Sequence, residues 1–205
     1  MSVTTAIKED YIEQQILQAA KRLFTVHGLA KVTMDDVAKA IGKGRSSLYY
    51  YYKSKDEIFD AVMNIEIQKM LGSMEKAADR AIGVEKKINA FFITKLDHVM
   101  QSSLFYNMLD VGMDADAISN FKKTKVAHHD LIMKQEGALL SEILNEGINT
   151  GELKPIDKND MDTLVFVLLS SLHGLKREVH LELNQREIEP AVNQLTQIIM
   201  HGLKK

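Results

Sequence analysis

The sequence predicts an all-α protein, and three observations carry this prediction. Apolar residues recur three and four positions apart along most of the 205 residues, which is the period of an amphipathic helix. No segment sustains the apolar–polar alternation of a strand, and the only two prolines are Pro155 and Pro190. The apolar content of 45% is high enough for a hydrophobic core in one domain or two small ones.

The first 53 residues predict three helices around a tight turn. Apolar residues at helical spacing give the first helix, over 9–27, and Gly28 is its expected C-terminal cap. Thr33 is an N-cap residue type, and two aspartates follow it in the first turn of the second helix, where the helix dipole favours acids. Gly42 ends this helix and supplies the turn, and a third helix follows over about 45–51.

A long fourth helix is predicted from Ser54 to about residue 81, because Ser54 and Glu57 have the spacing of a capping box. This helix joins an N-terminal domain, residues 1–53, to a second helical domain, residues 54–205. Pro190 is expected in the first turn of the last helix, where proline is tolerated. The further helices are predicted over 84–101, 103–111, 115–121, 123–149, 158–183 and 187–203.

The formal net charge is −2, so any footprint of a nucleic acid has to be local. Such a footprint lies between Asp36 and Asp56, where there are basic side chains and no acid. Four consecutive tyrosines, residues 49–52, lie in the same interval. A basic, tyrosine-rich helix-turn-helix favours contact with a phosphate backbone and a DNA groove. The basic residues of the interval are Lys39, Lys43, Arg45, Lys53 and Lys55.

Residues 33–59 resemble the helix-turn-helix of the TetR family of bacterial repressors. The shared pattern is a TxxDVAxAxG helix with its glycine turn, a leucine–tyrosine pair, and a K-S-K-x-E start to the next helix. Two positions depart from it: Lys43 replaces a small apolar residue, and Gly44 replaces a serine-like N-cap. The resemblance implies an N-terminal three-helix DNA-binding domain and a C-terminal helical domain for ligand binding and dimerisation.

Helical spacing divides the third helix between two faces. Leu48 and Tyr52 share a face that points into the core, whereas Arg45, Ser46 and Tyr49 share one that points outward. This outward face, extended by the next tyrosine, is the predicted surface for DNA. The alternative is a tyrosine-rich solvent face of an ordinary helical bundle.

The resemblance also implies roles for single residues. It implies that Tyr49 and Tyr51 touch backbone phosphates and that Lys55 binds another at a helix N-terminus. Arg45 is the candidate for reading a base edge, because its guanidinium can form two hydrogen bonds to guanine. The predicted DNA-binding residues are Thr33, Lys43, Gly44, Arg45, Ser46, Tyr49, Tyr50, Tyr51 and Lys55.

The last two predicted helices carry apolar stripes. The stripe over 158–183 has the 4-3-4-3-4 spacing of a helix-packing seam, and small residues such as Gly174 permit a close approach. The resemblance implies a two-fold dimer in which such helices form a four-helix bundle. The alternative is that both stripes fill the core of a single chain. The predicted dimer residues are Met161, Val165, Leu168, Leu172, Leu175, Val179, Val192, Leu195 and Ile199.

Aromatic and methionine side chains concentrate over 91–133, with polar groups among them. Such a composition predicts a mostly apolar cavity with a few polar anchors, for a small hydrophobic effector of little or no charge. It fits a plain core equally well, because methionine is a common gap filler. The predicted pocket residues are the wall candidates Phe92, Leu96, Met100, Tyr106, Met133 and Phe166 and the polar anchors His98 and Asn107.

The sequence shows no catalytic, cofactor or metal motif. It has no cysteine, which excludes disulfides and thiolate catalysis. His128 and His129 are adjacent, so a helix turns them about 100° apart and away from a common metal. The N-terminus lacks the apolar core of a signal peptide, and no apolar run approaches the roughly 20 residues of a membrane helix. We therefore expect a cytoplasmic protein with no metal, no cofactor, no membrane partner and no enzyme activity.

These observations together predict a DNA-binding transcriptional regulator. By the resemblance, it is a homodimeric repressor that binds a palindromic operator and is released by a small molecule in its second domain. One alternative is a helical small-molecule-binding or carrier protein that does not bind DNA. The other is a ligand-independent DNA-binding adaptor whose second domain serves only partners.

Overall fold

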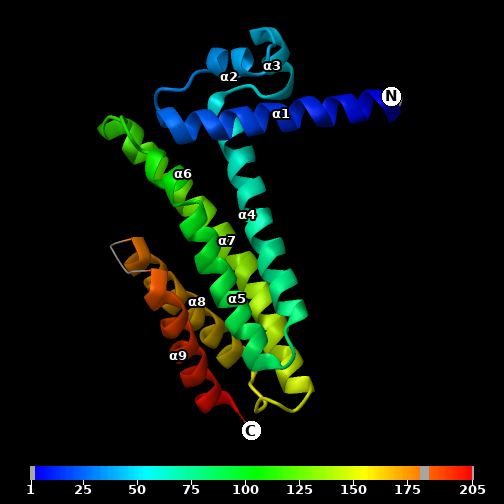
Figure 1. Ribbon diagram of the computed structural model, residues 1–205, viewed down its shortest axis with the longest axis vertical. Coiled ribbons are helices and arrows are strands. Elements are labelled where there is room, and N and C mark those ends of the chain that lie inside the picture. Colours follow the sequence, from blue (N-terminus) through cyan, green and yellow to red (C-terminus); the bar gives the residue numbers. More distant parts are fainter. Residues whose placement is uncertain (1–2, 181–184, 205) are drawn as a thin grey trace. The chain divides into compact units, whose positions relative to one another are not determined.

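The computed structural model describes residues 3–180 and 185–204, and this part of the chain is almost entirely helical (Figure 1). Its described residues form no strand, and one isolated antiparallel bridge joins Leu153 to Lys204. The predicted all-α fold with an N-terminal helix-turn-helix domain and a C-terminal helical domain is confirmed. The helices are α1 Val3–His27, α2 Met34–Ala40, α3 Arg45–Tyr51, α4 Lys55–Arg80, α5 Val84–Gln101, α6 Ser103–Met108, α7 Ala115–Asn149, α8 Lys158–His180 and α9 Gln185–Leu203.

Some helix boundaries differ from the predicted ones. The predicted helices over 115–121 and 123–149 are one helix, α7, because no glycine or proline near Lys122 interrupts the backbone hydrogen bonds. Helix α6 ends at Met108 rather than at residue 111, and Gly112 (φ 79°) lies in the turn that follows. Pro190 lies in the second turn of α9, where it removes a helical hydrogen bond. The predicted end of the helix over 158–183 falls outside the described residues.

The chain divides into two compact units. The N-terminal unit contains the residues up to Ile67 together with Ser103–Val126, and the C-terminal unit contains Gln68–Ser102 and the residues from Ala127 onward. Two of the three boundaries fall inside α4 and α7, whose residues are shared by both units, and the third falls between α5 and α6. A functional division between residues 53 and 54 stays a prediction.

The core of the N-terminal unit fixes the positions of α2 and α3. Phe24 of α1 and Phe59 of α4 pack edge to face, with ring centroids 6.1 Å apart, and both are buried. Val37 of α2 and Leu48 of α3 are completely buried in the same cluster. Because each short helix is attached by its own apolar side chain, the loops between them do not have to set the geometry alone.

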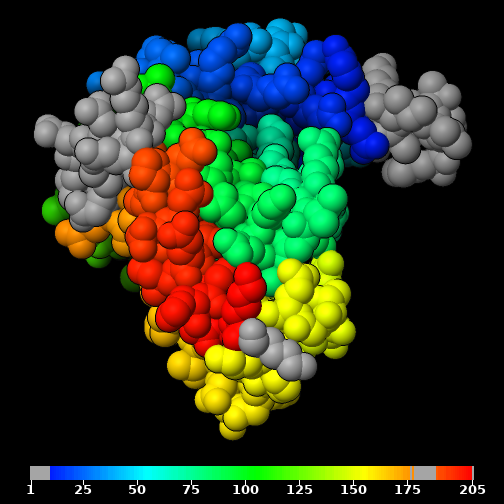
Figure 2. Space-filling view, turned by 60° about the horizontal axis from the view of Figure 1, so that its bottom comes forward, coloured from blue at the N-terminus to red at the C-terminus, as the bar shows by residue number. Residues whose placement is uncertain are grey.

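In the C-terminal unit, α5 packs against α8 and α9. The surface of α9, drawn in red in Figure 2, lies directly beside that of α5, drawn in green. Asn89 of α5 donates a hydrogen bond to Asn193 of α9 at 2.8 Å, which supplements the apolar contact at this interface. The core beneath contains Phe91, Phe92, Leu140, Leu144 and Leu172, all with less than 1% exposure.

The apolar stripes of α8 and α9 point mainly into this core. Of the predicted dimer residues, Leu175 and Leu195 are half-buried, and the side chain of Val179 is outside the described part. The others are buried within the single chain, so they pack against its own helices and are not offered to a second copy. These buried residues are Met161, Val165, Leu168, Leu172, Val192 and Ile199.

Both α8 and α9 also carry large apolar side chains that are exposed. Phe166 is 62% exposed, Val167 is 50% exposed and Ile198 is 61% exposed. Gly174, two turns after Phe166, has no atom within 4 Å of the position that a Cβ would occupy. Within the described residues, no helix is long and apolar enough to cross a membrane.

Candidate nucleic-acid interface

Thr33 begins α2 as one half of a capping box. Its Oγ1 accepts a hydrogen bond from the backbone N–H of Asp36 at 3.2 Å and donates one to Asp36 Oδ2 at 2.7 Å. The backbone N–H of Thr33 donates to the same carboxylate at 2.9 Å, and these bonds hold the pKa of Asp36 below its ordinary value. The predicted N-cap is therefore confirmed, and the Thr33 hydroxyl is already engaged in holding the start of the helix.

The turn between α2 and α3 closes by backbone hydrogen bonds. The N–H of Gly42 donates to the carbonyl of Lys39 at 3.1 Å, and the N–H of Lys43 donates to that of Ala38 at 3.0 Å. This pair of bonds is a Schellman motif, and it requires the left-handed backbone that Gly42 adopts (φ 65°). Gly44 is the N-cap of α3 with an extended backbone, so the two departures from the family pattern leave the turn intact.

The inward face of α3 is held by two side chains, as its spacing predicts. Leu48 is completely buried, and Tyr52 is 8% exposed. The hydroxyl of Tyr52 donates a hydrogen bond to Glu13 Oε1 of α1 at 2.7 Å. Burial, with this carboxylate beside it, raises the pKa of Tyr52 well above its ordinary value, so the hydroxyl stays a donor. These two contacts fix the rotation of α3 about its axis.

The outward face of α3 carries Arg45 and Tyr49. Arg45 Nη2 donates to the hydroxyl of Tyr49 at 3.1 Å, and its guanidinium carbon lies 5.4 Å from the centre of the same ring. Arg45 Nε also lies 3.4 Å from Asp35 Oδ1 of α2. Such exposed pairs are weak, so the guanidinium can exchange them for a base edge or a phosphate. Sequence spacing identified the Arg45–Tyr49 neighbourhood but not its link to Asp35.

The other predicted DNA-binding residues of the turn and α3 lie at the surface. Lys43, Gly44 and Ser46 are exposed, and Tyr50 is 68% exposed. Tyr51 is half-buried, and its ring meets that of Tyr50 edge to face with centroids 5.0 Å apart. Cations, small polar groups and tyrosine hydroxyls are thus presented together at the start and along one side of α3, which suits hydrogen bonding to phosphate oxygens.

Lys55 is occupied within the unbound chain. Its ammonium donates to the carbonyl oxygens of Leu29 at 2.7 Å and Ala30 at 3.3 Å, which ties the loop after α1 to the start of α4. Burial lowers the pKa of Lys55 below its ordinary value. Lys55 also lines a cavity of about 540 Å³, together with Phe59 and Phe121 among other residues. Its position at the first residue of α4 agrees with the predicted helix N-terminus, while its contacts show a structural role as well.

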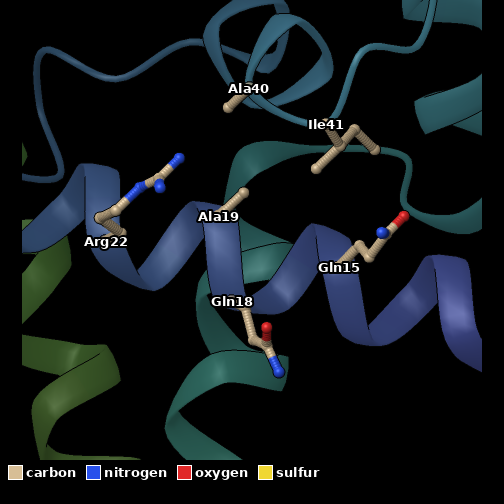
Figure 3. Close-up of a pocket in the computed structure, with 6 residues that line it drawn as sticks. All are labelled: Gln15, Gln18, Ala19, Arg22, Ala40 and Ile41. Atoms are coloured by element: carbon tan, nitrogen blue, oxygen red, sulfur yellow. The ribbon is translucent and has the colours of Figure 1, made fainter.

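A shallow groove of about 500 Å³ lies between α1 and the end of α2 (Figure 3). In the figure, Arg22 extends from α1 toward the side formed by Ala40, whereas Gln18 points away from α2. Ile41 belongs to the groove and directly precedes the turn at Gly42, so the groove reaches the helix-turn-helix. Its amide and guanidinium groups are hydrogen-bond donors that suit phosphate oxygens.

The pattern of the family described as bacterial regulatory proteins, tetR family, matches residues 16–62, from the middle of α1 to the start of α4. The chain belongs to the TetR family. The match covers the capping box, the glycine turn, the whole of α3 and Lys55, which are the features that form the interface described above.

The chain is also similar to known regulators beyond the helix-turn-helix. The chain is 26% identical over 161 residues to the HTH-type transcriptional regulator YhgD of Bacillus subtilis, covering 75% of this chain and 76% of that one. It is 23% identical over 197 residues to the HTH-type transcriptional regulator QacR of Staphylococcus aureus, covering 95% of this chain and 99% of the other. These TetR-family relatives are named as transcriptional regulators, not as enzymes.

Solved structures share the fold. A transcriptional regulator from Cytophaga hutchinsonii superposes with a TM-score of 0.65 at 21% identity, covering 94% of this chain and 98% of the other. The fatty acid degradation regulator FadR from Bacillus halodurans superposes with a TM-score of 0.66 at 17% identity, covering 90% of this chain and 93% of the other. At these identities the likeness establishes the fold of both units of this TetR-family chain and nothing finer.

The predicted effector-pocket residues are divided between the two units. Phe92 and Leu96 are buried in the core of the C-terminal unit, and Met100 and Met133 pack against it. His98, on the same helix as Phe92, is half-buried. The structure places the remaining three elsewhere: Tyr106 and Asn107 belong to the N-terminal unit, and Phe166 lies at the surface of α8.

The same core contains a polar cluster that the sequence pattern did not predict. Lys95 of α5 and Glu136 of α7 are buried and form an ion pair, and His173 of α8 joins them. The signal was present in the sequence, because Lys95 interrupts an otherwise apolar run of positions that point inward from α5. An ionisable residue at a core position is a recognised marker of a functional site.

Proposed function

We propose that this protein is a dimeric repressor that binds a palindromic DNA operator through α3 and leaves it when a small, mostly apolar effector binds in the C-terminal unit. The observation that carries the proposal is the outward face of α3, where Arg45 and Tyr49 are exposed while Leu48 and Tyr52 anchor the helix from behind. Positioning of a recognition helix by a buried face is the geometry of helix-turn-helix DNA reading.

Mobility shift on the region upstream of its own gene tests DNA binding itself. Saturable, sequence-dependent binding supports a regulator. Lack of any DNA binding, combined with binding of lipophilic compounds, would establish the carrier function in its place. DNA binding that no lipophilic compound alters would establish a ligand-independent adaptor.

Arg45→Ala is expected to weaken binding to the specific operator by about 5- to 150-fold per half-site. The reason is that a bidentate contact, two hydrogen bonds from one guanidinium to one base, is worth about 1–3 kcal/mol. Binding to a random duplex should change far less, since that binding depends on phosphate contacts. The measurement is the dissociation constant on both duplexes at one salt concentration.

Two further variants serve as comparisons for Arg45→Ala. Lys55→Ala removes a candidate phosphate contact and should weaken binding to both duplexes alike. Arg80→Ala removes an exposed arginine at the far end of α4 and should change neither. Equal losses on both duplexes for Arg45→Ala would remove its assignment as the base-reading residue.

The dimer is proposed to form through the exposed face of α8 and α9, with Phe166, Val167 and Ile198 at its centre. Large apolar side chains exposed together mark a contact surface, and Gly174 leaves room for a close approach by a second helix. A face of this kind differs from the buried stripe that includes Leu172, since a residue fully inside the chain cannot also contact a partner.

The double substitution Phe166→Asp/Ile198→Asp is expected to convert the dimer to a monomer without unfolding it, because both side chains are exposed in the single chain. Sedimentation velocity at micromolar concentration measures the state. Val126→Asp, at an exposed valine of the N-terminal unit, is the matched control and should leave the dimer intact. A wild-type protein that sediments as a monomer would refute the interface.

A further inference from the structure

Three ionisable side chains from three helices meet in the C-terminal unit. The Lys95 ammonium donates to Glu136 Oε2 and approaches His173 Nε2 at 2.6 Å. His173 Nε2 and Glu136 Oε2 are 3.6 Å apart, so the three groups form one cluster, here called the Lys95–Glu136–His173 triad. The side chains of Lys95 and Glu136 are 2% and 0% exposed. Since an ammonium can only donate, His173 accepts at Nε2 when its ring is neutral.

Stability does not explain this triad. Burying an ion pair costs much of what the pair returns, and well-packed apolar side chains of similar volume serve a core at least as well. The positions around the triad on α5, α7 and α8 are occupied by such side chains, all buried in one cluster. They are Phe91, Phe92, Leu96, Leu140, Leu169 and Leu172. An ionic group in apolar surroundings of this kind is a candidate anchor for a ligand.

One oxygen of the triad has no partner. Glu136 Oε1 is buried and accepts no hydrogen bond within the described part of the chain, although a carboxylate oxygen can accept two. Buried polar atoms are almost always satisfied, so a buried carboxylate oxygen without a donor calls for a specific explanation. A ligand that brings a donor to this oxygen would supply what the chain does not.

The triad lies close to the surface on one side. The His173 side chain is 21% exposed, and its ring lies against that of His129, with centroids 5.1 Å apart at an angle of 56°. His129 is exposed. The ring of His173 therefore lies between the buried carboxylate, 3.6 Å from its Nε2, and the exposed His129. Glu136 itself lies on α7, whose first turns belong to the N-terminal unit, so a ligand at this residue contacts a helix that both units share.

We propose that the Lys95–Glu136–His173 triad is the polar anchor of the effector site, and that Glu136 Oε1 selects an apolar molecule bearing a hydrogen-bond donor, a hydroxyl or an ammonium group. The inference rests on the proposed function, whose effector it defines chemically. A molecule with acceptors alone leaves Oε1 unsatisfied and adds a second acceptor beside it. Lys95 is already shared between Glu136 and His173, so it does not favour a ligand carboxylate.

Three probes of equal carbon number separate the donor from the apolar body: decan-1-ol, decan-1-amine and decan-2-one. Titration calorimetry on the wild type should give dissociation constants at least about tenfold lower for the alcohol and the amine than for the ketone, as expected for a hydrogen bond to a charged group. If only the amine shows the preference, the selected donor is a cation; if both do, it is any O–H or N–H group.

The double variant Lys95→Met/Glu136→Leu removes both charges together, which preserves folding better than removing one. It should bind the three probes within about threefold of one another, because only the shared apolar contact remains. Glu142→Gln, at an exposed glutamate of α7, should keep the wild-type preference. Circular dichroism verifies that each variant is folded.

Two results would overturn the inference: equal binding of all three probes by the wild type, including no binding of any, or a donor preference that survives in the double variant. DNA binding by the probe-free protein is measured beside them. If the protein binds DNA sequence-specifically but does not prefer the probes that carry a hydrogen-bond donor, only this inference is contradicted. If the protein binds no DNA, the proposed function is contradicted.

Discussion

Glu136→Leu is expected to lower the free energy of unfolding by about 3–5 kcal/mol, because it leaves the Lys95 ammonium buried without its counter-charge. Lys95 is 1% exposed, so without Glu136 its charge would be buried away from water and without the carboxylate that neutralises it. Urea unfolding followed by circular dichroism measures the change, with the slope of the transition checked for constancy.

The matched control is the double variant Lys95→Met/Glu136→Leu, which should recover most of the lost free energy. Replacing a whole buried ion pair by apolar side chains of similar volume is often neutral or stabilising. The pair of variants forms part of a double-mutant cycle, and the difference between them isolates the cost of the stranded charge. Equal losses in the single and double variants would show that packing, not charge, dominates at this site.

The same pair has a defined pH dependence. Burial raises the pKa of Glu136, but the neighbouring imidazole of His173 and the positive charge of Lys95 outweigh it, so the pKa of this carboxyl lies below its ordinary value. A lowered pKa in the folded state stabilises the fold above the unfolded pKa, and that stabilisation is lost as the pH falls through the folded pKa. The wild type should therefore lose more stability than the double variant on acidification.

The helix-turn-helix was predictable because its signals are local. Thr33 caps α2 through a residue three positions away, and Gly42 closes the next turn through its own backbone conformation. The inward placement of Leu48 and Tyr52 follows from helical spacing alone. Each of these features depends on chemistry within a few residues, so one segment of sequence contains all the information.

The C-terminal unit was less predictable because its features depend on which helix is the neighbour. Spacing shows that Leu172 lies on an apolar stripe, but not whether the stripe meets its own chain or a second copy. Likewise, Lys95 and Glu136 are 41 positions apart, and only the packing of α5 against its neighbours brings them together. The continuous course of α7 shows the same limit: a break was predicted where no residue enforces one.

Gly28→Ala is expected to lower the free energy of unfolding by about 2–5 kcal/mol, from two independent causes. Gly28 ends α1 with φ at 80°, a left-handed conformation that costs a residue with a Cβ about 1–2 kcal/mol. A Cβ there would also lie 2.9 Å from the carbonyl oxygen of Val111 and 3.1 Å from that of Met108. Both are backbone atoms, which cannot relieve the clash by a change of rotamer.

Two further glycines separate these causes. Gly42→Ala meets the left-handed conformation (φ 65°) with nothing within 4 Å, so it should cost only about 1–2 kcal/mol. Gly72→Ala, in the interior of α4 with open space around it, should stabilise the protein by about 0.5–1 kcal/mol. Melting temperatures should therefore rise in the order Gly28→Ala, Gly42→Ala, wild type, Gly72→Ala. If Gly28→Ala melted with or above Gly42→Ala, the close approach of the α6–α7 turn to the end of α1 would not contribute, and the left-handed backbone alone would account for the glycine.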